Sequence, residues 1–262
     1  MGGRWFLPEG FYARRGKRWL DAGASAALLI CLSPVLVAVA AAVRLALGPG
    51  VLFRQERAGR GGVPFTLLKF RSMRARRFEG EEDAARLGGF GRALRASALD
   101  EVPQLVNVLR GEMSLVGPRP LPVAYLARYT PREAGRLRVR PGLAGAAQAR
   151  GRNAVPWPER LEWDARYAAG VTLRGDALAA LGTLRVLLSG RGVAAPGHAT
   201  MPELPAPSAR PAMGHPAGDP LEPPVGGAVA AGVAEAAGGG RRWPAVAGQG
   251  EAGGGAGKGD VV

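Results

Sequence analysis

The chain has 262 residues, with 35 basic and 21 acidic side chains and a formal net charge of +14. Its single cysteine excludes an intramolecular disulfide, and no group of cysteines and histidines has the spacing of a zinc site. The basic excess predicts an anionic partner, which on charge alone is nucleic acid, an acidic membrane surface or a phosphorylated substrate.

An uncharged run of 22 residues, positions 22–43, is the first predicted element. It is rich in Ala, Leu, Val and Ile, and it is long enough to cross a bilayer as a helix. Ser33 and Pro34 lie near its middle, where a proline removes a backbone donor and clashes with the preceding turn. We therefore predict a break or sharp bend of the helix at Ser33 and Pro34.

Basic residues flank this run on both sides, which places both flanks on the cytoplasmic side of a membrane. A bent helix that enters and leaves by the same leaflet satisfies both flanks. We favour this re-entrant form over about residues 20–47 of an N-terminal segment 1–48, with a single-pass anchor as the alternative. A cleaved signal peptide is less favoured because its apolar core is usually shorter. Asp21 lies beside Lys17 and Arg18 and could form ion pairs with them at the membrane surface.

Two short strands are predicted next, at residues 51–55 and 65–71, joined by a glycine-rich turn. A β-hairpin is the simplest interpretation. Lys69 and Arg71 are two residues apart, so on a strand they share a face and could meet an anionic group together. A solvated strand edge would give the same pattern.

Adjacent carboxylates at Asp100 and Glu101 lie at the start of a predicted helix. Asp100 is placed to cap that helix, and the positive end of the helix dipole favours its ionised form and nearby phosphoryl oxygens. Neighbouring helical side chains diverge by about 100 degrees, so the two carboxylates should have different roles. The alternative is a purely structural N-cap followed by a first-turn acid.

The segments around this acidic pair are also patterned. The glycine-rich stretch 88–92 has the composition of a loop that approaches a ligand, and it brings Arg92 and Arg95 beside the pair. The helix after Asp100 should bury one apolar face and stop at Gly111. The residues of that face are Val102, Leu105, Val106 and Leu109.

Arginines in loops restricted by glycine and proline follow. Arg119 lies between two prolines, which suits a guanidinium held ready for bidentate phosphate recognition, although Pro-Arg-Pro is also typical of a rigid turn. Arg140 and the segment 148–153 repeat this arrangement. Convergence of these loops on the acidic pair would form a site for an anionic substrate.

The C-terminal part divides into a helix and a tail. Leu178, Leu181, Leu184 and Leu188 fall on one side of a predicted helix over residues 176–189, which lies either at a membrane interface or on the protein core. From residue 201 onward, 24 of 62 residues are Gly or Pro and few can build a core. We predict a disordered tail over residues 201–262.

The ordered series of motifs resembles the bacterial sugar transferase family, the small membrane-inserted phosphoglycosyl transferases that start glycan assembly on polyprenyl phosphate. The resemblance covers about residues 13–203. The matching motifs are Lys17-Arg18-x-x-Asp21, Ser33-Pro34, Phe53-Arg54-Gln55-x-Arg57, Lys69-Phe70-Arg71-Ser72-Met73, Leu99-Asp100-Glu101, Pro103-Gln104-Leu105, Asn107-Val108-Leu109, Met113-Ser114-Leu115-Val116-Gly117-Pro118-Arg119-Pro120 and Gly151-Arg152-Asn153.

This resemblance implies a mainly helical α+β, monotopic membrane protein with a catalytic domain over residues 49–200 on the cytoplasmic face of the bacterial inner membrane. It implies that Asp100 attacks the β-phosphate of a UDP-sugar and releases UMP, and that polyprenyl phosphate then takes the phosphosugar from Asp100. Glu101 is implied as the second catalytic residue. Mg²⁺ is implied as the cofactor, with Asp100 as its ligand.

The resemblance also implies the binding partners. These are a UDP-sugar donor, a polyprenyl phosphate acceptor and membrane lipid; nucleic acid is not expected, and a homodimer is left open. The implied substrate-binding residues are Lys69, Arg71, Arg92, Arg119, Gln148, Arg152 and Asn153.

Four positions depart from the family pattern, and they leave the sugar preference and the efficiency of the reaction undefined. These positions are Ala98, Ala144, Ala146 and Arg150. The competing interpretation is a membrane-tethered basic binding protein or scaffold without chemistry.

Overall fold

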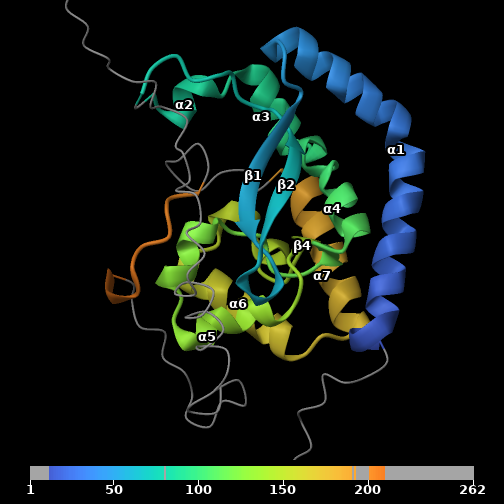
Figure 1. Cartoon of the computed structure of the whole chain (residues 1–262), viewed down its shortest axis with the longest axis vertical. Helices are drawn as coiled ribbons and strands as arrows, with labels where there is room; N and C mark the ends of the chain where they lie inside the picture. Colours follow the sequence, from blue (N-terminus) through green and yellow to red (C-terminus); the bar gives the residue numbers. More distant parts are fainter. Residues whose placement is uncertain (1–11, 80, 191, 193–200, 210–262) are drawn as a thin grey trace, which may run out of the picture.

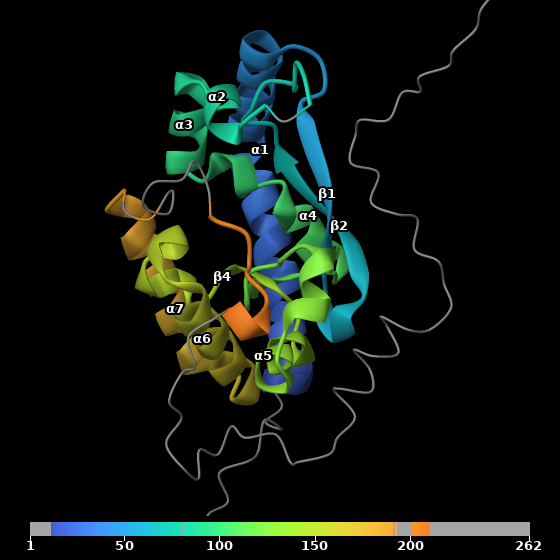
Figure 2. The same cartoon turned by 90° about the vertical axis from the view of Figure 1, so that its left-hand side faces the viewer.

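The computed structural model describes residues 12–79, 81–190, 192 and 201–209, and these form a mainly helical α+β fold, as predicted (Figure 1). Figure 2 shows α6 and α7 on one side of the molecule and the β1–β2 hairpin on the other. The elements are α1 (Lys17–Leu47), β1 (Leu52–Ala58), β2 (Pro64–Phe70), α2 (Asp83–Arg86), α3 (Gly89–Ala96), α4 (Gln104–Arg110), β3 (Ser114–Val116), α5 (Pro131–Ala134), β4 (Gly142–Ala144), α6 (Trp157–Ala169) and α7 (Leu173–Leu188).

Helix α1 has 31 residues and a most apolar stretch of mean hydropathy 2.6, and only 6% of that stretch is buried inside the protein. Among the described residues it is the one helix long and apolar enough to cross a membrane. Its exposed side chains include Trp19, Ile30, Val37 and Leu45. Water does not favour such a surface, so α1 is suited to membrane contact.

The predicted break at Ser33 and Pro34 does not interrupt α1. Pro34 lies inside one continuous helix, and Figure 1 shows that this helix changes direction along its length. Pro34 cannot donate to the carbonyl of Ile30, and the hydroxyl of Ser33 donates to that carbonyl instead, at 2.7 Å. Proline is the usual cause of such a bend, and Pro34 is the one proline within α1.

Polar contacts attach the first turns of α1 to the rest of the protein. Asp21 is buried and accepts hydrogen bonds from the Ser114 hydroxyl at 2.7 Å and the Leu115 amide at 3.1 Å. Lys17 forms an ion pair with Asp176 at the start of α7. The expected pairing of Asp21 with Lys17 and Arg18 is therefore wrong. Arg18 instead donates to carbonyls at the end of α4, where a cation is favourable.

The last turns of α1 also contact the domain. Val43 is fully buried in an apolar cluster with Phe70 of β2 and Leu94 of α3. Arg71 donates from one Nη to the carbonyls of Leu47 and Gly48, at 2.6 and 2.7 Å. Both ends of α1 are thus fixed to the same folded domain.

The predicted hairpin is confirmed. β1 and β2 pair antiparallel, from Leu52 opposite Phe70 to Ala58 opposite Pro64. The free edge of β2 is covered by the fully buried side chain of Asn107 in α4. Asn107 donates to the carbonyl of Thr66 at 2.8 Å and accepts from the amide of Leu68 at 3.1 Å. This side chain fixes the hairpin against α4.

Replacement of Asn107 by Ala should destabilise the protein, because the Thr66 carbonyl and the Leu68 amide lose their partner in a buried setting. We expect a loss of about 3 kcal/mol and a Tm lower by about 6–12 °C. The measurement is thermal unfolding of the detergent-solubilised protein. Arg110→Ala, an exposed change on the same helix, is the matched control. An unchanged Tm for Asn107→Ala would show that this contact does not hold the hairpin.

A second, parallel pair of strands positions the loop that carries Arg119. β3 pairs with β4, with Ser114 opposite Gly142 and Val116 opposite Ala144. A Cβ added to Gly142 would lie 2.1 Å from the amide nitrogen of Gly117, so only glycine permits this close backbone crossing. The chain leaves the crossing directly into Pro118 and Arg119.

Three further predictions from the sequence concern residues 88–92, helix α7 and the C-terminal tail. The predicted loop at residues 88–92 is wrong, because α3 begins at Gly89. Gly91 packs against the backbone of Ser72, two residues after β2. The leucines predicted on one side of α7 are 49–79% exposed, which excludes the alternative of core packing. The tail predicted from residue 201 begins too early, since Leu204 is fully buried beside Trp157 and Leu161. The rest of the tail, 210–262, lies outside the described residues.

Candidate active site

Asp100 and Glu101 lie in a single 3-10 turn, Leu99–Glu101, that follows α3. Ala98 enters this turn in the left-handed region, with φ of 56°, a strained conformation for a residue with a side chain. Pro103 has no amide hydrogen to donate to the Leu99 carbonyl, so a regular α-helix begins only at Gln104. The prediction that Asp100 caps the helix is therefore wrong.

The helix that follows, α4, buries a different face from the predicted one. Of the expected stripe only Leu105 is fully enclosed, beside Gln104, Asn107 and Val108. The predicted stop at Gly111 is confirmed by its left-handed φ of 81°. A helix fixed in this way gives the acidic turn a rigid support.

Glu101 is held by Arg119 in a two-point ion pair. The Nη2 to Oε1 distance is 2.6 Å and the Nη1 to Oε2 distance is 3.3 Å. Burial by itself would raise the pKa of Glu101, but the charge and hydrogen bonds of Arg119 outweigh it and hold that pKa well below its usual range. Glu101 is therefore a permanently ionised carboxylate that orients Arg119.

Asp100 is in the opposite situation. It is 4% exposed, and within the described part of the chain its carboxylate has no hydrogen bond or ion pair. Burial and the neighbouring charge of Glu101 raise its pKa to about 6, against the opposing charges of Lys69, Arg95 and Arg119. Asp100 is thus a desolvated carboxylate with its lone pairs unused.

Lys69 and Arg95 approach Asp100 from two other elements. Lys69, from β2, is largely desolvated, which lowers its pKa, and Asp100 provides the largest compensating charge. Its ammonium lies 5.3 Å from the ring centre of Phe53, which gives a cation-π contact. Arg95, from α3, also has Asp100 as its strongest favourable charge. We call Lys69, Arg95, Arg119 and Arg152 the cationic cluster.

The backbone of Arg119 is held by a residue of a buried ion pair that was not predicted from the sequence. Arg136 donates to the backbone carbonyl of Arg119 at 2.6 Å and pairs with Asp164 of α6 at 2.7 Å. Arg57 of β1 donates to the carbonyl of Pro120 at 3.3 Å. These partners are 17 to 63 residues distant from the 119–120 segment, so no local pattern in the sequence pointed to them.

Arg152 completes the cationic cluster from the loop before α6. Its φ of 51° makes it, with Ala98, one of the two non-glycine residues of positive φ in the described chain. Arg160 of α6 donates to its carbonyl, which anchors this strained turn. Burial lowers the pKa of Arg152, and Glu101 is the charge that most strongly favours its protonated form. The predicted residue Arg152 therefore lies beside the acidic pair.

Four other predicted substrate-binding residues have partners elsewhere. Arg71 binds the carbonyls at the end of α1, and Arg92 is exposed and donates to the Leu87 carbonyl at 2.8 Å. Gln148 is buried and donates to the Leu143 carbonyl at 2.6 Å. The backbone amide of Asn153 donates to the Gly192 carbonyl at 3.0 Å. Of the two arginines expected beside the acidic pair, Arg95 interacts with Asp100, whereas Arg92, which the resemblance implied for substrate binding, does not.

The described residues offer few protein ligands for a metal ion. No group of three or more His, Cys, Asp or Glu side chains occurs among the residues that the structure describes. Mg²⁺ is commonly held by one or two carboxylates together with substrate phosphates and water. Asp100 provides one such carboxylate, whereas both oxygens of Glu101 are taken by Arg119. The residues present therefore fit a Mg²⁺ ion shared with a bound phosphate ligand.

Comparison with known proteins gives a consistent result. A family model described as bacterial sugar transferase matches residues 12–190. The uncharacterized sugar transferase EpsL of Bacillus subtilis (strain 168) is 42% identical over 187 residues, which cover 70% of this chain and 93% of that protein. The exopolysaccharide production protein ExoY of Rhizobium meliloti (strain 1021) is 33% identical over 212 residues, with coverage of 71% and 94%.

A further relative has a name that states a reaction. The UDP-glucose:undecaprenyl-phosphate glucose-1-phosphate transferase of Caulobacter vibrioides is 47% identical over 145 residues, which cover 52% of this chain and 54% of that protein. The chain therefore spans about half the length of this relative.

Proposed function

The chain belongs to the bacterial sugar transferase family and is a sugar-phosphate transferase, and we propose that it transfers a phosphosugar from a UDP-sugar to polyprenyl phosphate with release of UMP. We further propose that Asp100 is the nucleophile. The observation that carries this proposal is the contrast between the two acids: Glu101 is paired with Arg119, whereas Asp100 has no partner within the described residues.

The proposed reaction has two displacements at one phosphorus atom. A carboxylate oxygen of Asp100 forms a bond to the β-phosphorus of the donor, the bond from that phosphorus to the bridging oxygen breaks, and UMP leaves with the electron pair. An oxygen of polyprenyl phosphate then attacks the same phosphorus, and the bond to Asp100 breaks. The product is a polyprenyl diphosphate sugar, and the carboxylate is restored.

The cationic cluster supports this reaction electrostatically. A diphosphate carries two negative charges, and phosphoryl transfer depends chiefly on positioning and on stabilisation of those charges. Arg119 is oriented by its ion pair with Glu101 and by the hydrogen bond from Arg136 to its backbone carbonyl. The ammonium of Lys69 and the terminal amino groups of Arg95 have no ion-pair partner in the described chain. Asp100 is the residue that would hold Mg²⁺, and the ion would supply further neutralisation of the diphosphate charge.

The proposed location is the cytoplasmic face of the membrane, with α1 as a re-entrant helix. A straight helix of 31 residues is about 46 Å long, so in a transmembrane helix its two ends would lie on opposite sides. Here both ends contact the same domain, through Asp21 at the start and Val43 at the end. This supports entry and exit by one leaflet. The exposed leucines of α7 offer a second apolar surface to the bilayer.

The test of the function is release of UMP by detergent-solubilised protein supplied with Mg²⁺, polyprenyl phosphate and single UDP-sugars. We expect UMP with at least one donor, and with donor alone we expect at most about one UMP per protein molecule, as covalent catalysis requires. Salt-sensitive binding to acidic lipid or nucleic acid without any UMP would favour the non-catalytic alternative.

The reaction should fail in acid, because a protonated Asp100 cannot attack phosphorus. With the pKa of Asp100 near 6, kcat/KM for the UDP-sugar should fall about tenfold per pH unit below about pH 6. Glu101→Gln should move this acid limb to lower pH, since it removes the negative charge that raises the pKa of Asp100. Glu56→Gln, an exposed change on β1, should leave the limb in place. An unchanged kcat/KM down to about pH 5 would contradict the assignment.

A further inference from the structure

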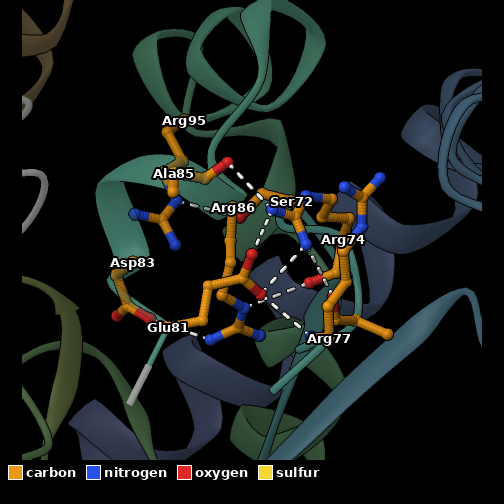
Figure 3. A network of polar contacts seen from close by, with 9 residues as sticks. Ser72, Arg74, Arg77, Glu81, Asp83, Ala85, Arg86 and Arg95 are labelled. Carbon is orange, nitrogen blue, oxygen red and sulfur yellow. Dashed lines mark hydrogen bonds and ion pairs between the residues drawn. The ribbon is translucent and has the colours of Figure 1, made fainter. Parts of the chain in front are cut away.

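Ser72 is a buried hydroxyl that the proposed reaction does not use. It lies two residues after β2, is 3% exposed, and accepts a hydrogen bond from Nε of Arg95 at 2.9 Å. Figure 3 shows this contact at the edge of a larger polar network. Ser72 therefore links the segment after β2 to α3 through Arg95, the arginine of α3 whose charge interacts with Asp100.

The backbone packing fixes this geometry a second time. Gly91 lies one helical turn before Arg95, and a Cβ added to it would be 1.9 Å from the carbonyl oxygen of Ser72. Helix α3 is thus in direct contact with the Ser72 backbone, and the side chain one turn later meets the Ser72 hydroxyl. Both ends of the contact are fixed, so the Nε hydrogen bond has little freedom to move.

The chain between Ser72 and α3 is held by its own ion pairs. Glu81 is buried and accepts from the guanidinium of Arg74, with one contact at 3.0 Å, and from the amide of Arg77 at 2.9 Å (Figure 3). Arg86 pairs with Asp83 at 2.8 Å. This network keeps the segment after Ser72 compact without using either Ser72 or Arg95.

The hydrogen bond from Nε to Ser72 leaves the two terminal amino groups of Arg95 available to a ligand. These groups have no hydrogen bond or ion pair in the described part of the chain, and the charge of Arg95 favours ionised Asp100. A guanidinium that is anchored through Nε can still offer two parallel donors to a phosphate. A free arginine would lose rotamer entropy on binding, and an anchored one loses less.

We propose that Ser72 is a positioning residue for the transferase reaction: its hydroxyl anchors Arg95 so that the guanidinium stays beside Asp100 and presents its terminal amino groups to the phosphate. This inference rests on the proposed function. The charged groups that face Asp100 are Glu101, Lys69, Arg95, Arg119 and Arg152. Among them, Arg95 alone bonds to Ser72 within the described residues.

The test is a double-mutant cycle with Ser72→Ala, Arg95→Gln and the double variant, in which kcat and KM for the UDP-sugar are measured separately at one pH. We expect Ser72→Ala to lower kcat/KM about tenfold, chiefly through a higher KM, because a displaced Arg95 no longer presents its two terminal amino groups to the donor phosphate. In the Arg95→Gln background, Ser72→Ala should have almost no further effect.

Two results would overturn the inference. One is an equal loss of kcat/KM from Ser72→Ala with and without Arg95, and the other is a KM that does not rise in Ser72→Ala. Either would mean that Ser72 acts only on the general stability of the fold. Failure of the wild-type protein to release UMP would instead overturn the proposed function, so the two failures are distinguishable.

Discussion

Asp100→Asn should abolish UMP release from UDP-sugar, with a loss of about 1,000-fold or more in kcat. An amide has almost the shape of the carboxylate but neither its charge nor its nucleophilic lone pairs, so the first displacement cannot begin. Because Asp100 has no partner in the described chain, the substitution breaks no hydrogen bond or ion pair there. The measurement is UMP release by purified protein with Mg²⁺ and a UDP-sugar.

The same substitution should stabilise the fold, which separates lost chemistry from lost structure. The pKa of Asp100 is raised from 3.8 to about 6, so the folded state binds a proton more tightly than the unfolded state does. Stability therefore falls as pH rises from about 4 to about 6, and above that range the ionised carboxylate costs on the order of 3 kcal/mol. Asp100→Asn removes this cost. Its Tm should exceed that of wild type near neutral pH and match it near about pH 4.

Glu56→Gln is the matched control for Asp100→Asn, since it makes the same kind of change at an exposed site. It should alter neither UMP release nor Tm. Retention of wild-type turnover by Asp100→Asn would remove Asp100 from the mechanism. A large fall in Tm near neutral pH would show that the carboxylate has a structural partner.

Arg119→Lys should lower kcat/KM for the UDP-sugar by about 100-fold. Lysine keeps the charge but cannot form the two-point contact that Arg119 makes with Glu101, nor offer a planar pair of donors to phosphate. Arg110→Lys, an exposed change on α4, is the matched control. The measurement is the dependence of UMP release on donor concentration.

A second variant distinguishes phosphate binding by Arg119 from simple pairing with Glu101. Arg119→Met combined with Glu101→Gln removes both charges and leaves neither one buried alone. If Arg119 contacts the donor, the double variant stays at least as impaired as Arg119→Lys. Recovery of activity in the double variant would mean that Arg119 serves only to neutralise Glu101.

The local chemistry of the site could be predicted from the sequence. Adjacent acids at Asp100 and Glu101 and an arginine held between prolines at 119 are short-range patterns, and the structure brings these residues together. The hairpin was likewise predictable from two short strand patterns joined by a glycine-rich turn. Its second strand places Lys69 where its charge interacts with Asp100. The chemical roles of these residues stay predictions until they are measured.

The rest of the site depends on contacts that a local pattern does not contain. The glycine-rich pattern placed both Arg92 and Arg95 beside the acidic pair, and the resemblance implied only Arg92 for substrate binding. The way α3 packs on Ser72 decides which of the two faces the site. The prediction that Asp100 caps the helix was wrong because Pro103 delays the start of α4 to Gln104. The pairing of Arg136 with Asp164 spans 28 residues, and such distant pairs become visible only when the chain is folded.

The covalent step can be tested most directly by mass spectrometry of the protein incubated with Mg²⁺ and a UDP-sugar, without polyprenyl phosphate. We predict a mass increase equal to one phosphosugar, located on the peptide that contains Asp100 and lost when polyprenyl phosphate is added. A protein that turns over normally with both substrates, yet never carries an adduct on Asp100 with the donor alone, would contradict the proposed mechanism.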